Sequence, residues 1–445
     1  MDDQPPHAEA ALSGAVTGTG GEGAGGGAVL AGGEPADARF DALTALLGAH
    51  RDVWEPRPFA SARPGWAEAH PEVARWLLAL DDAAVTRLEE APAAAFTDAP
   101  ATLRGWAEAA SALAAVPSVA ATPLGRLDDP RVPWRIPGRK WRQIQAFAAA
   151  AGEGGDPAEV VDWCAGKGHL GRTLGAVRGA AVTLVEHDAR LRREALELAA
   201  QVGVDARFAT ADAHGAEARA ELGPGVTAVA LHACGGLLVS LLRGAVAVGV
   251  PQVHAAPCCY HRAHVDGRGT VPVSAAGRAA GLALTHSALR LATADEVVAP
   301  GRLRRGRRRE NAWRLGLDEL LREASGVDVY TPLGTLPVEL VKRPFAAFCE
   351  EAAAIRGLAL PASWDPGRAE RVGWQRAQEA RALGLVRGLF RGALELWLAL
   401  DRALFLAEAR YRVRIGRFCA REVTPRNLLI SATRRDDLGD GEDTA

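Results

Sequence analysis

The sequence predicts an α/β fold in which a mostly parallel sheet ends in an antiparallel hairpin. From about residue 130, short apolar runs alternate with helical patterns, which is typical of parallel strands joined by crossover helices. The last two apolar runs are joined by a short link, REVTPR, which contains turn residues and indicates a hairpin. Before residue 130 the apolar spacing is close to 3.6, so a helical region precedes the sheet.

Composition divides the chain into four segments. Residues 1–35 are rich in Gly and Ala and are predicted to be a disordered tail, as is the short end 436–445. Residues 36–125 are predicted to form a small helical domain, whose tryptophans we assign to its core. Residues 126–435 carry the sheet, interrupted by an Arg-rich helical insertion at about 262–400.

Seven strands are predicted in the sheet. The first five are separated by helical patterns or polar turns, and the last two form the hairpin. In chain order they cover residues 160–164, 181–188, 206–212, 226–234, 252–260, 411–419 and 427–434.

A glycine-rich loop follows the first strand, in the stretch VVDWCAGKGHLG at residues 160–171. A phosphate-binding P-loop is excluded because Lys167 is followed by Gly rather than by Ser or Thr. Gly166, Gly168 and Gly171 match the dinucleotide fingerprint. They equally match the loop of an adenosylmethionine-binding domain, and the third interpretation is a turn that binds no ligand.

Acidic residues at three strand ends favour adenosylmethionine. Asp162, Glu186 and Asp212 end the first, second and third strands. A carboxylate repels the pyrophosphate of a dinucleotide but attracts the sulfonium and ammonium groups of S-adenosyl-L-methionine. With the hairpin, these acids point to the class I methyltransferase fold, a Rossmann-like sheet, rather than to a dehydrogenase domain. The expected cofactor-binding residues are Asp162, Cys164, Gly166, Lys167, Gly168, Glu186, Asp212 and Ala213.

Four motifs carry a resemblance to a known family. DWCAGKGHLG, LHACGG, APCCYH and TPRNLLISA, in this order, resemble a family of orphan class I methyltransferases. Its eukaryotic branch includes a protein named for a ribosomal-RNA adenine dimethylase domain, and the tRNA acceptor-stem 2′-O-methyltransferase is a more distant relative. The resemblance covers roughly residues 125–260 and 395–435 and implies a methyltransferase that uses S-adenosyl-L-methionine. The Trp-rich N-terminal region and the Arg-rich insertion depart from it.

Three residues are the expected catalytic candidates. His232 is expected to orient or deprotonate the acceptor, because imidazole titrates near neutral pH. Tyr260 is expected to stack on an acceptor base or ring. Lys140 lies in the cationic, amphipathic stretch 138–147 and is expected, with Gln143, to contact the acceptor or the methionine carboxylate. The alternative is that this stretch only docks on the sheet.

A metal site was weighed against these roles. Two neighbouring strand ends supply five soft ligands, but adjacent cysteines seldom bind one ion and the spacing fits no standard zinc pattern. We therefore expect no metal, with His261 instead hydrogen-bonding the acceptor and Cys234 packing as a small residue. The five residues are His232, Cys234, Cys258, Cys259 and His261.

The distribution of charge suggests an RNA acceptor. Residues 1–120 carry 17 acidic and 7 basic side chains of the chain's 54 and 52, which leaves 37 acidic and 45 basic, a net +8, in the rest. Six arginines fall within residues 302–309, either as a phosphate-binding patch or as a solvated loop. We expect RNA, such as tRNA or rRNA, as the acceptor. A small-molecule methyltransferase and a non-catalytic RNA-binding protein are the alternatives.

Other features bound the cellular context. No apolar run is long enough for a membrane span, and no feature indicates specificity for DNA. The acidic N-terminus lacks the pattern of a secretory leader, and the six cysteines are too dispersed for a disulfide framework. We therefore expect a cytoplasmic protein.

Overall fold

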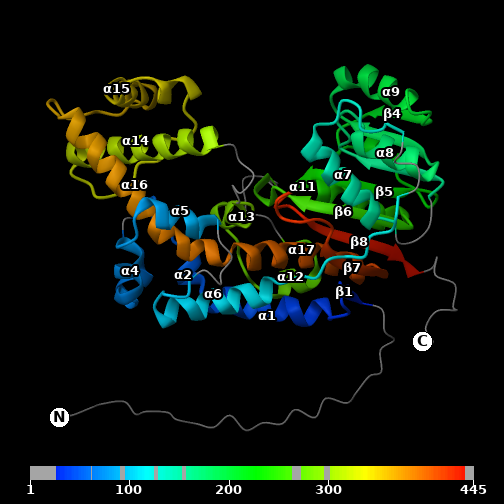
Figure 1. Ribbon diagram of the computed structural model, residues 1–445, viewed down its shortest axis with the longest axis horizontal. Helices are drawn as coiled ribbons and strands as arrows, with labels where there is room; N and C mark the ends of the chain where they lie inside the picture. The colour runs from blue at the N-terminus through cyan, green and yellow to red at the C-terminus, as the bar shows by residue number, and fades with distance from the viewer. Residues whose placement is uncertain are drawn as a thin grey trace, which may run out of the picture.

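A computed structural model describes residues 27–61, 63–90, 96–124, 129–152, 157–262, 272–294 and 301–435. The predicted tail at 436–445 and most of the predicted N-terminal tail lie outside the described residues. Figure 1 shows three neighbouring regions: a twisted sheet flanked by helices, a layer of long helices beside one edge of the sheet, and a helical lobe farther away.

The sheet has eight strands in the order β1-β7-β8-β6-β5-β2-β3-β4. Only β8 runs antiparallel to its neighbours, β6 and β7. This arrangement confirms the predicted Rossmann-like α/β fold with a C-terminal hairpin. Each of the seven predicted strands is found with its ends within two residues of the expected positions. The strands are β1 (Ala28–Leu30), β2 (Glu159–Trp163), β3 (Ala181–Glu186), β4 (Ala206–Thr210), β5 (Thr227–Cys234), β6 (Gln252–Cys258), β7 (Tyr411–Arg417) and β8 (Leu428–Arg434).

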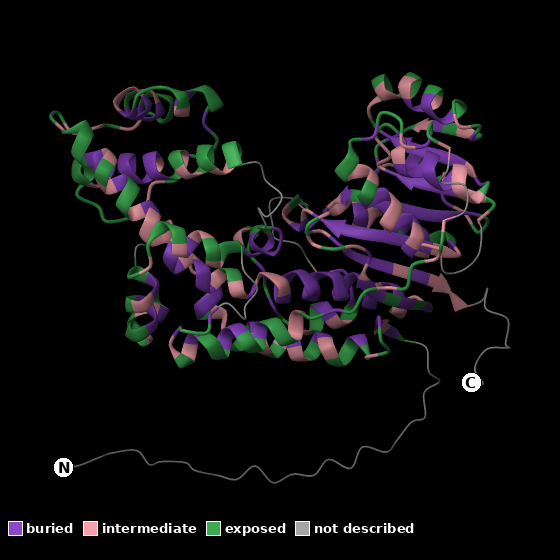
Figure 2. Cartoon of the chain, viewed as in Figure 1, coloured by how far each residue is buried: buried purple, intermediate pink, exposed green. Residues whose placement is uncertain are grey.

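Helices cover both faces of the sheet, so its central strands are buried on both sides (Figure 2). Apolar runs such as VAL and VVDW suit this position, because a doubly covered parallel strand exposes neither face. On one face lie α7 (Gly138–Ala150), α8 (His169–Arg178) and α9 (Arg192–Ala200). On the other lie α11 (Gly236–Val248) and α17 (Arg391–Glu408).

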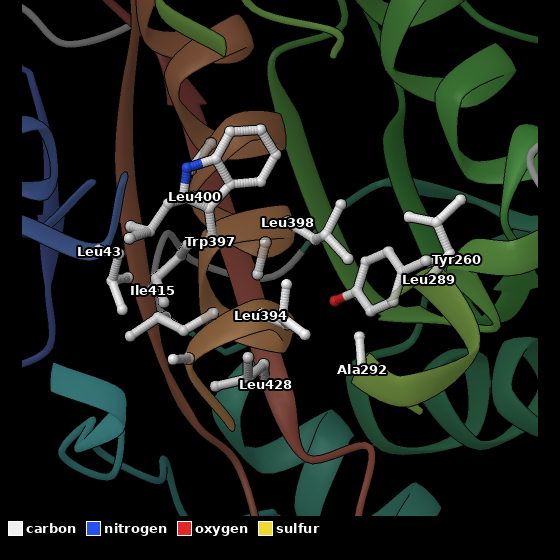
Figure 3. Packing of buried hydrophobic residues seen from close by; sticks show 14 of the residues in the cluster. Leu43, Tyr260, Leu289, Ala292, Leu394, Trp397, Leu398, Leu400, Ile415 and Leu428 are labelled. Atoms are coloured by element: carbon white, nitrogen blue, oxygen red, sulfur yellow. The ribbon is translucent and has the colours of Figure 1, made fainter. Parts of the chain in front are cut away.

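The N-terminal helices share a core with the C-terminal part of the chain. Phe40 of α1 (Ala36–Ala49) stacks on Trp397 of α17 with ring centroids 5.0 Å apart, and Trp397 Nε1 donates to Thr44 Oγ1 at 2.8 Å. Figure 3 shows Leu43 together with Trp397 and Ile415 of β7 in the same apolar cluster. Residue 125 therefore does not separate two independent cores, in contrast to the predicted helical domain 36–125.

The predicted tail 1–35 is too long at its C-terminal end. Residues 28–30 form β1, which pairs in parallel with β7 at the edge of the sheet. Leu30 is buried, and the amide of Ala31 donates to the carbonyl of Ile415 at 2.6 Å. Three residues are too few to show a strand period within a Gly-rich sequence, so this strand has no clear signal.

The remaining helices complete the layer and the lobe. Trp313, Phe345 and Phe348 form a second core in the lobe, between α14, α15 and α16. The bounds are α2 (Arg51–Trp54), α3 (Gly65–Ala69), α4 (Pro71–Leu78), α5 (Asp82–Glu90), α6 (Ala101–Ala114), α10 (Ala216–Arg219), α12 (Ala275–Ala279), α13 (His286–Ala292), α14 (Gly301–Ser325), α15 (Phe345–Arg356) and α16 (Pro366–Leu389), with short 3₁₀ turns η2 (Ala189–Leu191), η3 (Tyr260–Arg262) and η4 (Val338–Lys342).

The arginine run 302–309 is the first turns of α14, not a loop. Arg304 pairs with Glu90, and Arg308 donates to Asp82 at 3.2 Å and to Thr86 Oγ1 at 2.8 Å. Part of the run therefore attaches the lobe to α5. Among the described residues, no helix is long and apolar enough to span a membrane.

Candidate active site

The candidate site lies where the strand order reverses, between β2 and β5. Crossovers from β2 run towards β3 and β4, whereas those from β5 run towards β6, so the loops after β2 and β5 diverge. In open α/β sheets the crevice outside such a switch point is where ligands bind. The loop 164–168 follows β2, and the turn at Gly235 follows β5.

The loop after β2 depends on two glycines. Gly166 and Gly168 have φ of +58° and +66°, a region that residues with a Cβ rarely adopt. A Cβ on Gly168 would also lie 2.6 Å from Leu184 Cδ1, whereas a Cβ on Gly166 would meet no atom within 4 Å. Gly168 thus lets the loop pack on β3, while Gly166 leaves open space above the backbone.

Asp162 is buried beneath this loop. Its Oδ2 accepts a hydrogen bond from the amide of Gly171, in the first turn of α8, at 2.8 Å. Burial raises the pKa of the Asp162 carboxyl to about 7, against the opposing effects of that hydrogen bond and of the Lys140 ammonium. A nearby cation would therefore favour the ionised carboxylate.

Glu186 and Asp212 follow the next two strands. Glu186 Oε2 accepts from the amide of Gly166 at 3.0 Å, and Oε1 accepts from the amide of Asp188 at 3.1 Å. Glu186 therefore ties the end of β3 to the glycine loop. Asp212 is exposed and accepts from the amide of His214 at 2.9 Å, while Ala213 beside it is buried.

The other two loop candidates have local roles in this conformation. Lys167 Nζ lies 2.9 Å from Glu194 Oε1 of α9, so its charge is paired on the outer side of the loop. Cys164 is half-buried at φ +60°, and burial raises the pKa of its thiol to about 12.

His232 sits on a distorted strand end. The pairing of β5 with β6 shifts register between Leu231 and Cys234, and His232 has φ +84°. Its Nε2 lies 3.1 Å from Oε1 of Gln143 in α7. The residue is exposed to solvent. Neighbouring protein atoms nevertheless desolvate the imidazole, and this effect, together with the Lys140 charge, lowers the pKa of His232 to about 4. The ring is therefore neutral at physiological pH.

Lys140 lies in the first turn of α7 and is half-buried. Burial lowers the pKa of its ammonium, and the neighbouring Asp162 carboxyl and Cys258 thiol oppose this effect. The Lys140 ammonium is therefore coupled electrostatically to side chains at the ends of β2 and β6.

Tyr260 lies in the core rather than at the crevice. Figure 3 shows its ring among Leu289, Ala292 and Leu398, and only 1% of the residue is exposed. The Arg402 guanidinium lies 5.1 Å from the ring centroid. The expected stacking of Tyr260 on an acceptor disagrees with this position, because the turn at Cys259 directs the ring inward. Its neighbour His261 is half-buried and packs edge-on against His286.

Three thiols meet at the ends of β5 and β6. Cys234 and Cys258 are paired across the ladder with their Sγ atoms 3.4 Å apart. The Sγ atom of Cys259 completes a group whose members all lie within 4.8 Å of one another. Of the five soft ligands considered from the sequence, the structure therefore brings together three.

The segment before α7 contains a feature that sequence reasoning missed. Arg172, buried in α8, donates to the carbonyls of Val132 and Trp134 and so holds this segment beside the glycine loop. Trp134 is 48% exposed, and the Arg135 guanidinium lies 4.9 Å from its ring centroid. The sequence does contain a signal for this surface, namely the pair Trp134 and Arg135 in a proline-bounded, arginine-rich stretch that precedes the cofactor motif.

Comparison with known proteins supports the class of chemistry. Residues 139–265 match the family model described as a methyltransferase domain. The matched region runs from α7 past η3 and includes every cofactor-binding and catalytic candidate named above. Neither the curated proteins nor the solved structures gave a match. The fold and the family match together support a methyltransferase, with its methyltransferase domain in the sheet region of the chain.

Proposed function

We propose that the protein is an S-adenosyl-L-methionine-dependent methyltransferase whose acceptor is RNA. The observation that carries the cofactor assignment is the set of acids at three consecutive strand ends around the glycine loop: Asp162, Glu186 and Asp212. A dinucleotide would bring its pyrophosphate next to the Asp162 carboxylate, whereas adenosylmethionine brings two positive charges. The open space above Gly166 is consistent with a ligand lying against the loop.

Each residue has a distinct role in this proposal. The cofactor supplies a methyl group activated on a sulfonium. Asp162 holds the cationic end, Glu186 accepts from ribose hydroxyls, and Asp212 accepts from the adenine amino group. His232, neutral and fixed by Gln143, orients the acceptor by accepting a hydrogen bond. Its low pKa makes it a weak base, so alignment of the acceptor is its main contribution.

RNA as the acceptor is supported by the surface beside the loop. Trp134 is partly exposed and has the Arg135 guanidinium over its ring, and aromatic and arginine side chains are the groups on which nucleic-acid bases stack. Arg139 and Arg142 are exposed one and two turns farther on, along α7. The Arg135 guanidinium also lies 3.7 Å from Glu194, the partner of Lys167, so this surface adjoins the cofactor loop directly.

The test of the cofactor is calorimetry with S-adenosyl-L-methionine, with NADH as the comparison ligand. Asp162→Ala is expected to weaken adenosylmethionine binding by about 1–3 kcal/mol, the loss of a charge-assisted interaction. Binding of NADH but not of adenosylmethionine would refute the proposal. Incubation with tritiated cofactor and cellular RNA, protein and metabolite fractions then identifies the acceptor class, and label confined to metabolites would point to a small-molecule enzyme.

The RNA surface has a matched control. Trp134→Ala is expected to weaken RNA binding by about 1–3 kcal/mol, the usual value of one stacked base. Trp374→Ala removes another exposed tryptophan, 44% accessible on α16 of the distant lobe, and is expected to leave RNA binding unchanged. Equal effects of the two substitutions would contradict the assignment of the surface.

A further inference from the structure

The three thiols at the ends of β5 and β6 are an unusual concentration of cysteine. The whole chain contains only six cysteines, and three of them, Cys234, Cys258 and Cys259, place their Sγ atoms within 4.8 Å of one another. They come from two neighbouring strand ends, one of them across the ladder from the other two. The spacing of these cysteines along the sequence does not by itself explain why their thiols lie together.

The spacing of the sulfur atoms suits a tetrahedral metal. A zinc–thiolate bond of about 2.3 Å places two sulfur ligands about 3.8 Å apart at the tetrahedral angle. The Sγ atoms of Cys234 and Cys258 are 3.4 Å apart, and the third thiol lies within 4.8 Å of both. Small changes of side-chain torsion would therefore give a common centre.

The backbone is distorted to present these thiols. A bulge interrupts the pairing of β5 and β6 just before Cys234, and Cys259 has φ +44°. A bulge redirects the side chains that follow it, and positive φ in a residue with a Cβ costs about 1–2 kcal/mol. Packing alone would not require two such distortions around one group of sulfur atoms.

Positive charges face the group. The Lys140 ammonium acts on Cys258, and the Arg262 guanidinium acts on Cys259. Three thiolates around a divalent ion carry a net charge of about −1, by formal counting of ligand charges. The two cations, with a formal charge of about +2, would more than offset the negative charge of such a centre.

We propose that Cys234, Cys258 and Cys259 bind a zinc ion whose fourth position is open to an exogenous ligand. Thiolates select soft or borderline ions, which favours zinc over magnesium or calcium. No fourth His, Cys, Asp or Glu ligand atom joins the group among the described residues. Three protein ligands with an open position are the arrangement of catalytic rather than structural zinc sites.

The test is metal binding by the full-length chain, purified without metal-affinity chromatography and kept reduced. One zinc per chain is expected by elemental analysis, with affinity measured by competition with a chromogenic zinc indicator. Cys234→Ser and Cys259→Ser are each expected to weaken binding by more than about 100-fold, since losing even an outer partner of a ligand costs about 10- to 100-fold. Cys419→Ser, a half-buried cysteine elsewhere, is the control and is expected to bind zinc normally.

Cobalt substitution tests the geometry. Three thiolates in a tetrahedral site give intense visible bands and a near-ultraviolet charge-transfer band, and both are expected to weaken in Cys259→Ser. Added 2-mercaptoethanol is expected to change the visible bands by occupying the open position, whereas an unchanged spectrum would refute the open position. Circular dichroism of the metal-free variants verifies that they are folded.

Two results would overturn the proposal. One is zinc binding of unchanged affinity in both serine variants. The other is a chain that binds no zinc and forms a disulfide between Cys234 and Cys258 in air. Neither result bears on the proposed function, because adenosylmethionine binding is measured separately and Asp162→Ala is expected to leave zinc binding intact.

Discussion

The two strand ends that flank the switch point are built in different ways. After β2, two glycines supply positive φ at little cost, and the acids Asp162 and Glu186 hold the loop through backbone amides. At the ends of β5 and β6, His232 and Cys259 adopt positive φ although each has a Cβ. A residue with a Cβ adopts positive φ once in the loop after β2, at Cys164, and twice at the ends of β5 and β6.

This difference shows what each end has to present. The cofactor loop presents backbone, so a residue without a side chain serves best there. The opposite end presents an imidazole and thiols at turn positions, so the side chain is kept and the strain is held by the surrounding ladder. Two of the three residues with a Cβ at positive φ around the site therefore lie on the side where acceptor chemistry is expected.

The largest expected effect tests the glycine loop after β2. Gly168→Ala is expected to lower the free energy of unfolding by about 2–4 kcal/mol, because positive φ and the 2.6 Å contact with Leu184 both oppose a Cβ. Gly166→Ala meets no atom and is expected to cost about 1–2 kcal/mol, from φ alone. Urea unfolding of both variants gives the comparison, and equal costs would mean that contact with β3 is unimportant.

The second expected effect concerns the carboxyl of Asp162, which lies beneath the glycine loop. The Asp162 pKa is raised from 3.8 to about 7 in the fold, so its protonated form stabilises the protein below pH 4 and this contribution is lost as pH rises through about 7. Asp162→Asn keeps an acceptor for the Gly171 amide without the charge. Its stability relative to the unsubstituted chain is expected to rise by about 2–3 kcal/mol between pH 5 and pH 8. If the stability difference between the two proteins stayed constant across this pH range, the Asp162 carboxylate would be solvated rather than buried.

The same carboxyl makes cofactor binding depend on pH. Adenosylmethionine needs the ionised form, so binding below the folded pKa requires release of a proton. Affinity is expected to be about tenfold lower at pH 6 than at pH 8, and calorimetry in buffers of different ionisation enthalpy measures the proton released. In Asp162→Asn the pH dependence is expected to vanish. If it persists in that variant, another group is responsible.

The smallest expected effect tests the end of β5. His232→Gly and His232→Ala both lose the hydrogen bond to Gln143, but only Gly relieves the positive φ. The Gly variant is expected to be more stable than the Ala variant by about 1 kcal/mol, after allowing for the greater flexibility of Gly in the unfolded chain. Thermal unfolding ranks the two. An Ala variant as stable as the Gly variant would show that the strand end relaxes without the imidazole.

The sheet was predictable because each strand carries its own signal. Runs such as AVTLVE and TAVALHAC are apolar, β-branched and bounded by turn residues, so their positions follow from local sequence. The acids at their ends could be assigned to one edge for the same reason, since parallel strands place their carboxyl ends together. The cofactor half of the candidate site was thus accessible from sequence.

What could not be predicted depends on contacts between distant segments. Tyr260 follows β6 as expected, but the direction of its ring is set by φ +44° at Cys259 and by space beside Arg402. The helices at 36–114 have ordinary amphipathic patterns, which do not reveal that their partner is α17. The contact between Cys234 and Cys258 could be predicted only from the register in which β5 pairs with β6.

The short strand β1 links the start of the described chain to its end. Ala28 is paired with Val413, so the sheet edge is completed only by residues nearly 400 positions apart in sequence. During synthesis, β2 to β6 can assemble from one continuous stretch, while β1 and its neighbouring helices must wait for α17 and β7 to emerge. Such long-range pairing slows folding and leaves apolar surface uncovered for longer. We therefore expect the N-terminal helices of the nascent protein to depend more on protection by chaperones than the stretch that forms β2 to β6.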